Sequence, residues 1–127
     1  MYELIILGGG PAAISAGIYA GRKKIKALII AGSFGGQSIV SDKIENWIGT
    51  KEISGFELAK SLEDHLRSQE GLEILEGELG ESIEKKEGGF IVKTSSGKTF
   101  ETKAVIIATG GHHRKLEIPG ESKFEGK

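Results

Sequence analysis

Residues 4–13, which read Leu-Ile-Ile-Leu-Gly-Gly-Gly-Pro-Ala-Ala, decide the fold of this chain. The four apolar residues at 4–7 predict a strand that is buried on both faces. Pro11 suits the first turn of a helix, where a missing N–H costs nothing, and the sequence that follows predicts a helix over 12–22. A second apolar run at 27–30 completes a strand–helix–strand unit, which predicts a parallel sheet with a right-handed crossover.

The glycine turn between the first strand and the helix matches the pattern G-x-G-x-x-G/A, with alanine in the last place. In this pattern Gly8 permits the sharp turn, Gly10 lets backbone N–H groups approach a pyrophosphate, and Ala13 lets helix and strand pack closely. Pro11 and Ala12 open the helix, whose N-terminus then faces the anion. The alternative is a turn that merely links strand to helix, but the buried strand and Ala-rich helix around it favour a dinucleotide site.

The rest of the chain predicts one α/β domain of the Rossmann-like class. Residues 32–54 are expected to form a long, ordered loop that touches a ligand. An amphipathic helix is expected over 55–69 and a short strand over 73–75. Apolar and polar residues alternate over 79–102, which predicts a three-stranded antiparallel meander covering one side of the sheet. Residues 105–108 predict another buried strand.

The composition excludes several classes of function. The chain has 127 residues, which fit one domain, and a net charge of −1, which gives no field to attract nucleic acid or an anionic membrane. It has no cysteine, so it offers no disulfide, thiolate metal ligand or cysteine nucleophile. We expect neither a metal site nor a catalytic side chain. No apolar run is long enough for a signal peptide or a membrane span, so a cytoplasmic location is expected.

Several motifs, in order along the chain, resemble those of the low-molecular-weight thioredoxin reductases. Together they extend over nearly the whole chain, which makes them far more specific than a single glycine pattern. The matching stretches are GGGPAAISAGIYAGR at 8–22, GGQ at 35–37, IENWIG at 44–49, ISG at 53–55, AVIIATG at 104–110, and RKL with IPG within 114–120.

The resemblance implies FAD as the cofactor. It implies that the turn at 8–13 holds the FAD pyrophosphate and that 31–37 lines the ribose and the flavin. Backbone near Leu79 would meet the adenine. The other positions that the resemblance assigns to FAD are Ala31, Gly32, Gly36, Gln37 and Asn46, with Gln37 and Asn46 beside the isoalloxazine, and Ala108, Thr109 and Gly110, which close over the cofactor.

The sequence departs from the expected pattern in two places. The acidic residue expected about twenty residues after the glycine turn is replaced by Ala31 and Gly32, so a ribose contact must come from backbone or from elsewhere. The family would also continue beyond residue 127 into an NADPH domain with a Cys-x-x-Cys pair, and then return to the FAD domain. We therefore expect an FAD-binding segment over 1–111, a polar exit segment over 112–127, and no activity from this chain alone.

Three functions remain open at this point. The favoured one is the FAD-binding part of a reductase in which NADPH reduces the flavin and the flavin reduces a disulfide. The second is a segment of a flavoprotein like the ferredoxin– or flavodoxin–NADP reductases, which lack redox cysteines. The third is a complete, non-enzymatic dinucleotide-binding module. Without a C-terminal return, the strand at 105–108 is expected to expose an edge that pairs with a second copy or a complementing chain, unless 115–127 folds back over it.

Two aromatic features have competing interpretations. Trp47 could stack on a flavin, but a loop aromatic more often packs on the core, which we favour. His112 and His113 could bind a metal or move a proton. Adjacent histidines point apart on an extended chain, however, so a solvated polar junction is the favoured interpretation.

Overall fold

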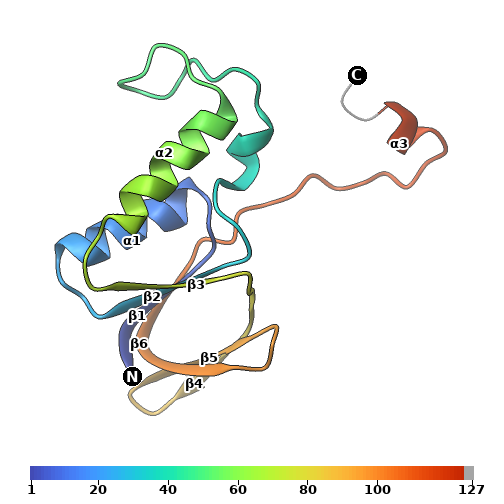
Figure 1. Cartoon of the computed structure of the whole chain (residues 1–127). Helices are drawn as coiled ribbons and strands as arrows, with labels where there is room; N and C mark the ends of the chain where they lie inside the picture. Colours follow the sequence, from blue (N-terminus) through green and yellow to red (C-terminus); the bar gives the residue numbers. More distant parts are fainter. Residues whose placement is uncertain (125–127) are drawn as a thin grey trace.

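The computed structural model describes residues 1–124 of the 127-residue chain. Strands and helices alternate in its first half, and a meander follows (Figure 1). The elements are β1 (Tyr2–Leu7), α1 (Pro11–Arg22), β2 (Ala27–Ala31), the 3-10 helix η1 (Gly36–Val40), α2 (Gly55–Arg67), β3 (Leu72–Glu76), β4 (Gly80–Lys86), β5 (Gly89–Thr94), β6 (Thr99–Ile107) and α3 (Glu121–Phe124). None of these described helices is long and apolar enough to cross a membrane.

The six strands form one sheet in the order β3-β2-β1-β6-β5-β4. β1 pairs in parallel with β2 and β6, and β2 pairs in parallel with β3, while β4 and β5 are antiparallel. Helices α1 and α2 cover one face of the sheet, and the β4–β5 hairpin lies on the opposite side (Figure 1). The predicted α/β class, the strand–helix–strand start and the meander on one side are all confirmed.

The core has two layers, one on each face of the parallel strands. Ile5 and Ile6 are both fully buried and point to opposite faces, as a strand's alternation requires. On the helix face, Ile6 packs with Ile14 of α1 and Leu66 of α2. On the other face, Ile5 packs with Val92 of the meander. The double burial explains why the strands read as continuous apolar runs.

The structure corrects the prediction of a separate buried strand over 105–108. Residues 99–107 form one continuous strand, β6, whose first part pairs with β5 and whose second part pairs with β1. The β5 pairing ends at Thr102, so beyond it β6 has a partner on one edge only among the described strands. Ile106 is 40% exposed and Ile107 is 66% exposed. An apolar run therefore does not imply burial where a neighbouring strand is lacking.

The segment after β6 extends away from the sheet (Figure 1). Residues 108–118 form neither helix nor strand, and the short α3 follows. Three large apolar side chains of this segment, Leu116, Ile118 and Phe124, are exposed. The described part of the tail therefore leaves the β6 edge open, whereas residues 125–127 lie outside the described residues. The predicted domain boundary at 111 stays a prediction.

Candidate functional site

The glycine turn lies at the carboxyl ends of the parallel strands, the edge where ligands of open α/β sheets bind. The Gly8 N–H donates to the carbonyl of Ile30 at 2.9 Å, which ties the turn to β2. The Gly35 N–H donates to the carbonyl of Gly9 at 2.9 Å. These two bonds place the turn between the end of β2 and the loop that leads into η1.

The three glycines of the turn differ in what surrounds the position of a side chain. A Cβ atom on Gly8, which has φ +125°, would lie 2.1 Å from the carbonyl oxygen of Ala108, and one on Gly9 would lie 2.0 Å from that of Ser33. The chain itself fills the space beside these two residues. On Gly10, the nearest atom to a Cβ would be the Cα of Gly36 at 3.7 Å, an ordinary contact. Space beside Gly10 is therefore left open to a ligand.

Helix α1 presents backbone donors beside this space. Gly10 is its N-cap residue and supplies no side-chain cap, and Pro11 occupies the first helical position without an N–H. The first of its backbone bonds runs from the Ile14 N–H to the carbonyl of Gly10 at 3.0 Å. The N–H groups of Ala12 and Ala13 therefore lack a helical partner and lie at the positive end of the helix dipole. Such an end binds phosphate without any charged side chain.

The loop carrying Gln37 lies directly against the glycine turn. Gly36 has φ +59°, and a Cβ on it would lie 2.9 Å from the Cα of Gly10. Gln37 is the next residue, at the start of η1, and its Nε2 lies 2.8 Å from Nδ1 of His112. The structure thus places Gly36 against the turn, with Gln37 next to it in the chain, and the role of both in FAD binding stays a prediction.

The segment 108–110 also lies beside the turn. The Ala108 N–H donates to the carbonyl of Leu7 at 2.8 Å, which extends the β1–β6 ladder by one residue. Gly110 has φ +71° and redirects the chain after Thr109. The close approach of Ala108 to Gly8 brings the two glycine motifs, about a hundred residues apart in sequence, to one edge of the sheet.

Leu79 has an exposed side chain and a hydrogen-bonded backbone. Its N–H donates to Ser95 Oγ at 3.2 Å, and its carbonyl accepts from the Ser95 N–H at 2.9 Å. These two bonds occupy both backbone groups of Leu79 itself, and the expectation that backbone near Leu79 meets the adenine stays a prediction. The side chain is 62% exposed, and its Cδ2 would lie 3.0 Å from a Cβ on Gly32. It therefore borders the surface at the end of β2, where Ala31 and Gly32 stand in place of an acid.

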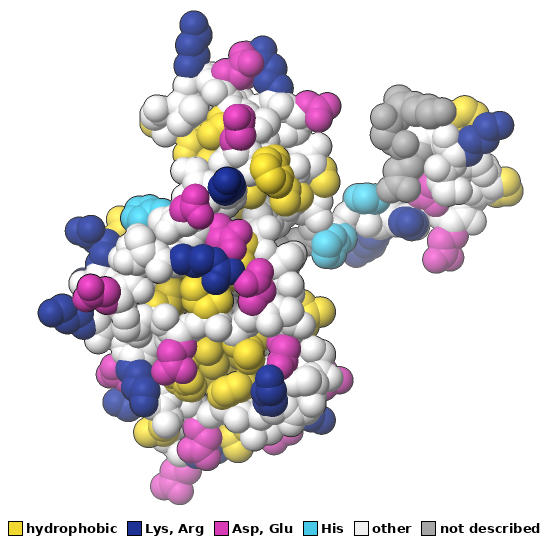
Figure 2. Space-filling model, in the orientation of Figure 1, with side chains coloured by type: hydrophobic (Ala, Val, Ile, Leu, Met, Phe, Trp, Pro, Cys, Tyr) yellow, Lys and Arg dark blue, Asp and Glu magenta, His cyan; other side chains and the backbone are white. Residues whose placement is uncertain are grey.

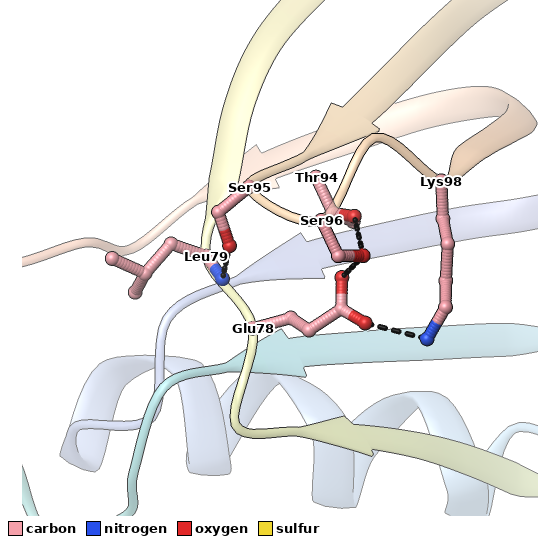
Figure 3. Close-up of polar contacts among 6 residues, drawn as sticks. All are labelled: Glu78, Leu79, Thr94, Ser95, Ser96 and Lys98. Carbon is pink, nitrogen blue, oxygen red and sulfur yellow. Dashed lines mark hydrogen bonds and ion pairs between the residues drawn. The ribbon is translucent and has the colours of Figure 1, made fainter.

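A polar cluster holds the backbone of Leu79 in place (Figure 3). The Glu78 carboxylate accepts from Lys98 Nζ at 2.5 Å and from Ser96 Oγ at 2.6 Å, and Thr94 Oγ1 lies 3.2 Å from Ser96 Oγ. Hydrogen bonds from Lys98, Ser96 and Thr94 lower the pKa of Glu78 to about 2, although burial of the carboxylate opposes them. The cluster joins the start of the meander to the β5–β6 turn, and the Leu79 side chain points away from it.

Asn46 and Trp47 lie in a different place from the glycine motifs. A backbone bridge between Ile44 and Ile53 closes the loop that carries them, and Figure 1 shows this loop beyond the N-terminal end of α2. Residues 45–51 line a hollow of their own that contains no glycine-turn residue. Trp47 is 40% exposed and belongs to neither core layer, so the favoured core packing is not observed. Among the described residues, the side-chain hydrogen bond of Gln37 is to His112 and not to Asn46.

The contact between His112 and Gln37 is one that the sequence interpretation missed. Two adjacent histidines in a polar segment show no hydrophobic periodicity and no metal-ligand spacing, so the sequence favours a solvated junction there.

Among the described residues, no group of three or more His, Cys, Asp or Glu could hold a metal ion. The visible face carries charges of both signs with apolar side chains between them, and no patch of one sign dominates it (Figure 2).

Comparison with curated proteins finds relatives over almost the whole chain. The chain is 36% identical over 126 residues to an NADH dehydrogenase of Bacillus subtilis (strain 168), covering 99% of this chain and 24% of that protein. It is 38% identical over 128 residues to a subunit of the alkyl hydroperoxide reductase of Pseudomonas putida, again covering 99% of this chain and 24% of that protein. The chain thus spans about a quarter of the length of these relatives.

Solved structures share the fold. The thioredoxin reductase of Lactococcus lactis superposes with a TM-score of 0.89 at 36% identity, covering 98% of this chain and 40% of that one. The thioredoxin reductase of T. acidophilum superposes with a TM-score of 0.87 at 38% identity, covering 99% and 41%. The family of pyridine nucleotide-disulphide oxidoreductases matches residues 2–127. With both glycine motifs at one edge of the sheet, this chain belongs to the pyridine nucleotide-disulphide oxidoreductase family.

Proposed function

We propose that this chain binds FAD and forms the FAD-binding part of a thioredoxin-reductase-like flavin oxidoreductase. The observation that carries the proposal is the open space beside Gly10, bordered by the donor end of α1 and by Gly36. Protein packing accounts for Gly8 and Gly9, whereas the absence of a side chain at Gly10 is accounted for by a ligand. The family, which the motifs and the relatives support, favours a flavin dinucleotide as that ligand.

The residues present fit a dinucleotide with a diphosphate at its centre. The N–H groups of Ala12 and Ala13 would hold the diphosphate, because the helix end provides donors and a positive dipole without requiring a counter-charge. Ala31 and Gly32, with the Leu79 side chain beside them, would receive the adenosine half. The flavin half would extend toward Gln37, Thr109 and Gly110. Asn46 joins this set only if its loop moves toward η1.

The flavin would supply the electron-transfer chemistry, and this chain would bind and orient it. The described residues hold no side chain positioned as a nucleophile or a general acid, and the sequence has no cysteine. In the whole protein we expect a reduced pyridine nucleotide to reduce the flavin, which then reduces a disulfide. A flavoprotein without redox cysteines is the second candidate. An NADH dehydrogenase is among the relatives, which supports this candidate.

Calorimetric titration of the purified chain with FAD and with NADP tests the proposal. We expect FAD to bind more tightly, because both glycine motifs and the Gln37 loop surround one site. Tighter binding of NADP, or no binding of FAD, would contradict it. A turnover assay with NADPH and an oxidised thioredoxin adds a second test. We expect no turnover from this chain by itself, because it contains no cysteine pair to relay electrons.

A further inference from the structure

A hydrogen bond joins two segments that both approach the glycine turn. Gln37 Nε2 lies 2.8 Å from His112 Nδ1, across 75 residues of sequence. Gln37 is the second residue of η1, directly after Gly36, on which a Cβ would lie 2.9 Å from the Cα of Gly10. His112 follows the turn at Gly110, in the segment that leaves β6. The bond therefore connects the loop after β2 with the segment after β6, at the edge where both sheet strands end.

The two glycines that precede His112 are open on the side where a side chain would lie. No atom lies within 4 Å of the Cβ position on Gly110 or on Gly111, so neither residue is packed against the body of the domain. Gln37 is likewise exposed. An exposed glutamine has three rotatable side-chain bonds and samples many rotamers unless a partner restricts it. The imidazole of His112 is that partner.

The chemistry of the two side chains fixes which way the amide points. Nε2 of Gln37 only donates, so Nδ1 of His112 must accept, and the imidazole proton is then on Nε2 of the ring. One amide hydrogen is used in this bond. The second amide hydrogen and the amide oxygen remain available, and their directions are set because the first hydrogen is held.

We propose that His112 is a positioning residue, which orients the Gln37 amide toward the flavin. The inference rests on the proposed function, because it takes the flavin to lie beside Gln37. His112 acts through Gln37 and contributes by restricting the amide to one hydrogen-bonding arrangement before FAD binds. Binding then requires less ordering of the loop, which increases affinity.

A double-mutant cycle tests this coupling. At saturating FAD, the visible circular dichroism of the bound flavin reports the arrangement around the ring, and titration gives the Kd. We expect His112→Ala to alter the dichroism and to weaken FAD binding about threefold to tenfold, as expected for one lost hydrogen bond. In a Gln37→Ala background the same change should alter neither quantity beyond about 1.5-fold, because coupled residues are non-additive. His112→Asn, which retains a side-chain acceptor, should restore most of the parent signal.

The arms of the experiment separate this inference from the proposed function. His65→Ala, a matched change of a histidine on α2, should leave the flavin dichroism and the Kd as in the parent. If the parent binds FAD and His112→Ala behaves as His65→Ala does, the inference is wrong and the proposed function stands. If the parent binds no FAD, both are overturned. NMR of the FAD-free chain checks the contact itself. A Gln37 side-chain amide resonance that is unchanged in His112→Ala would overturn the inference.

Discussion

The carbonyl oxygen of Ala108 occupies the space in which Gly8 would carry its side chain, because a Cβ atom on Gly8 would lie 2.1 Å from that oxygen. This contact joins the turn after β1 to the turn after β6. A Cβ atom on Gly9 would likewise lie 2.0 Å from the carbonyl oxygen of Ser33, which belongs to the loop after β2. Two of the three consecutive glycines thus hold neighbouring loops close, which leaves Gly10 facing the proposed ligand.

A first prediction compares Gly8→Ala with Gly10→Ala. Gly8→Ala should destabilise the fold by about 2–3 kcal/mol, because it adds a clash with backbone at a positive φ. Gly10→Ala should change stability by only about 0.5 kcal/mol, since its Cβ meets an ordinary contact and its φ is −79°. It should nevertheless weaken FAD binding about tenfold or more, equivalent to about 1.4 kcal/mol. Urea unfolding and FAD titration measure the two effects. Parent-like FAD affinity in Gly10→Ala would show that the phosphate lies elsewhere.

A second prediction concerns Leu79. Its exposed side chain beside Gly32 borders the surface assigned to the adenosine half. Leu79→Ala should therefore weaken FAD binding about tenfold, because one apolar contact with the cofactor is lost. FMN, which has no adenosine, should bind the variant and the parent with the same affinity. Leu116→Ala, an exposed leucine on the tail, is the matched control. If the variant binds FAD and FMN more weakly by the same factor, Leu79 does not contact the adenosine half.

The parts of the fold that depend on local patterns could be predicted from the sequence. The apolar run before Gly8, the small residues of α1 and the alternation in the meander each specify an element by nearby residues. The helix α2 also has a local start signal, because Ser54 and Glu57 form a capping box. The predicted bounds of both helices and of the first strand lie within two residues of the observed ones.

Features set by distant neighbours could not be predicted in this way. The exposure of Ile107 depends on β6 having no second neighbour there among the described strands. The family resemblance led us to expect an open edge at 105–108, but the apolar run by itself predicts burial. The engagement of Leu79 with Ser95 depends on the register of the meander, and a shift of one residue would reverse which groups pair. The bond between Gln37 and His112 joins exposed side chains that are far apart in the sequence. Their segments show no hydrophobic periodicity from which a contact could be predicted.

A third prediction concerns acid stability and Glu78. The folded-state pKa of Glu78 is about 2, below the ordinary value of 4.5. The ionised carboxylate therefore stabilises the fold above pH 4.5, and this stabilisation is lost as the pH falls toward 2. The parent should therefore lose stability more steeply over this interval than Glu78→Gln, which cannot titrate there. Urea midpoints measured from pH 6 to pH 2.5 give the comparison. Glu81→Gln, on exposed β4, is the control, and equal pH slopes in the parent and Glu78→Gln would contradict the assignment.

The last prediction concerns the open edge of β6. Beyond Thr102 this strand pairs with β1 on one side only among the described strands, so backbone N–H and C=O groups of 104–107 face outward on the other side. Such an edge, flanked by the exposed side chain of Ile107 and without an internal proline, is a template for pairing with another chain. We expect the isolated chain to self-associate as its concentration rises, and sedimentation velocity over a concentration series measures this.

Ile107→Lys should shift the chain toward the monomer, because a lysine at the edge disfavours pairing, with a stability change within about 0.5 kcal/mol for an exposed position. Val40→Lys makes the same kind of change on η1, at a residue that is also exposed, and should leave the association as in the parent. Amide hydrogen exchange locates the interface, since pairing should slow exchange in 104–107 as the concentration increases. A chain that stays monomeric at high concentration, or equal effects of the two lysine variants, would show that this edge does not mediate association.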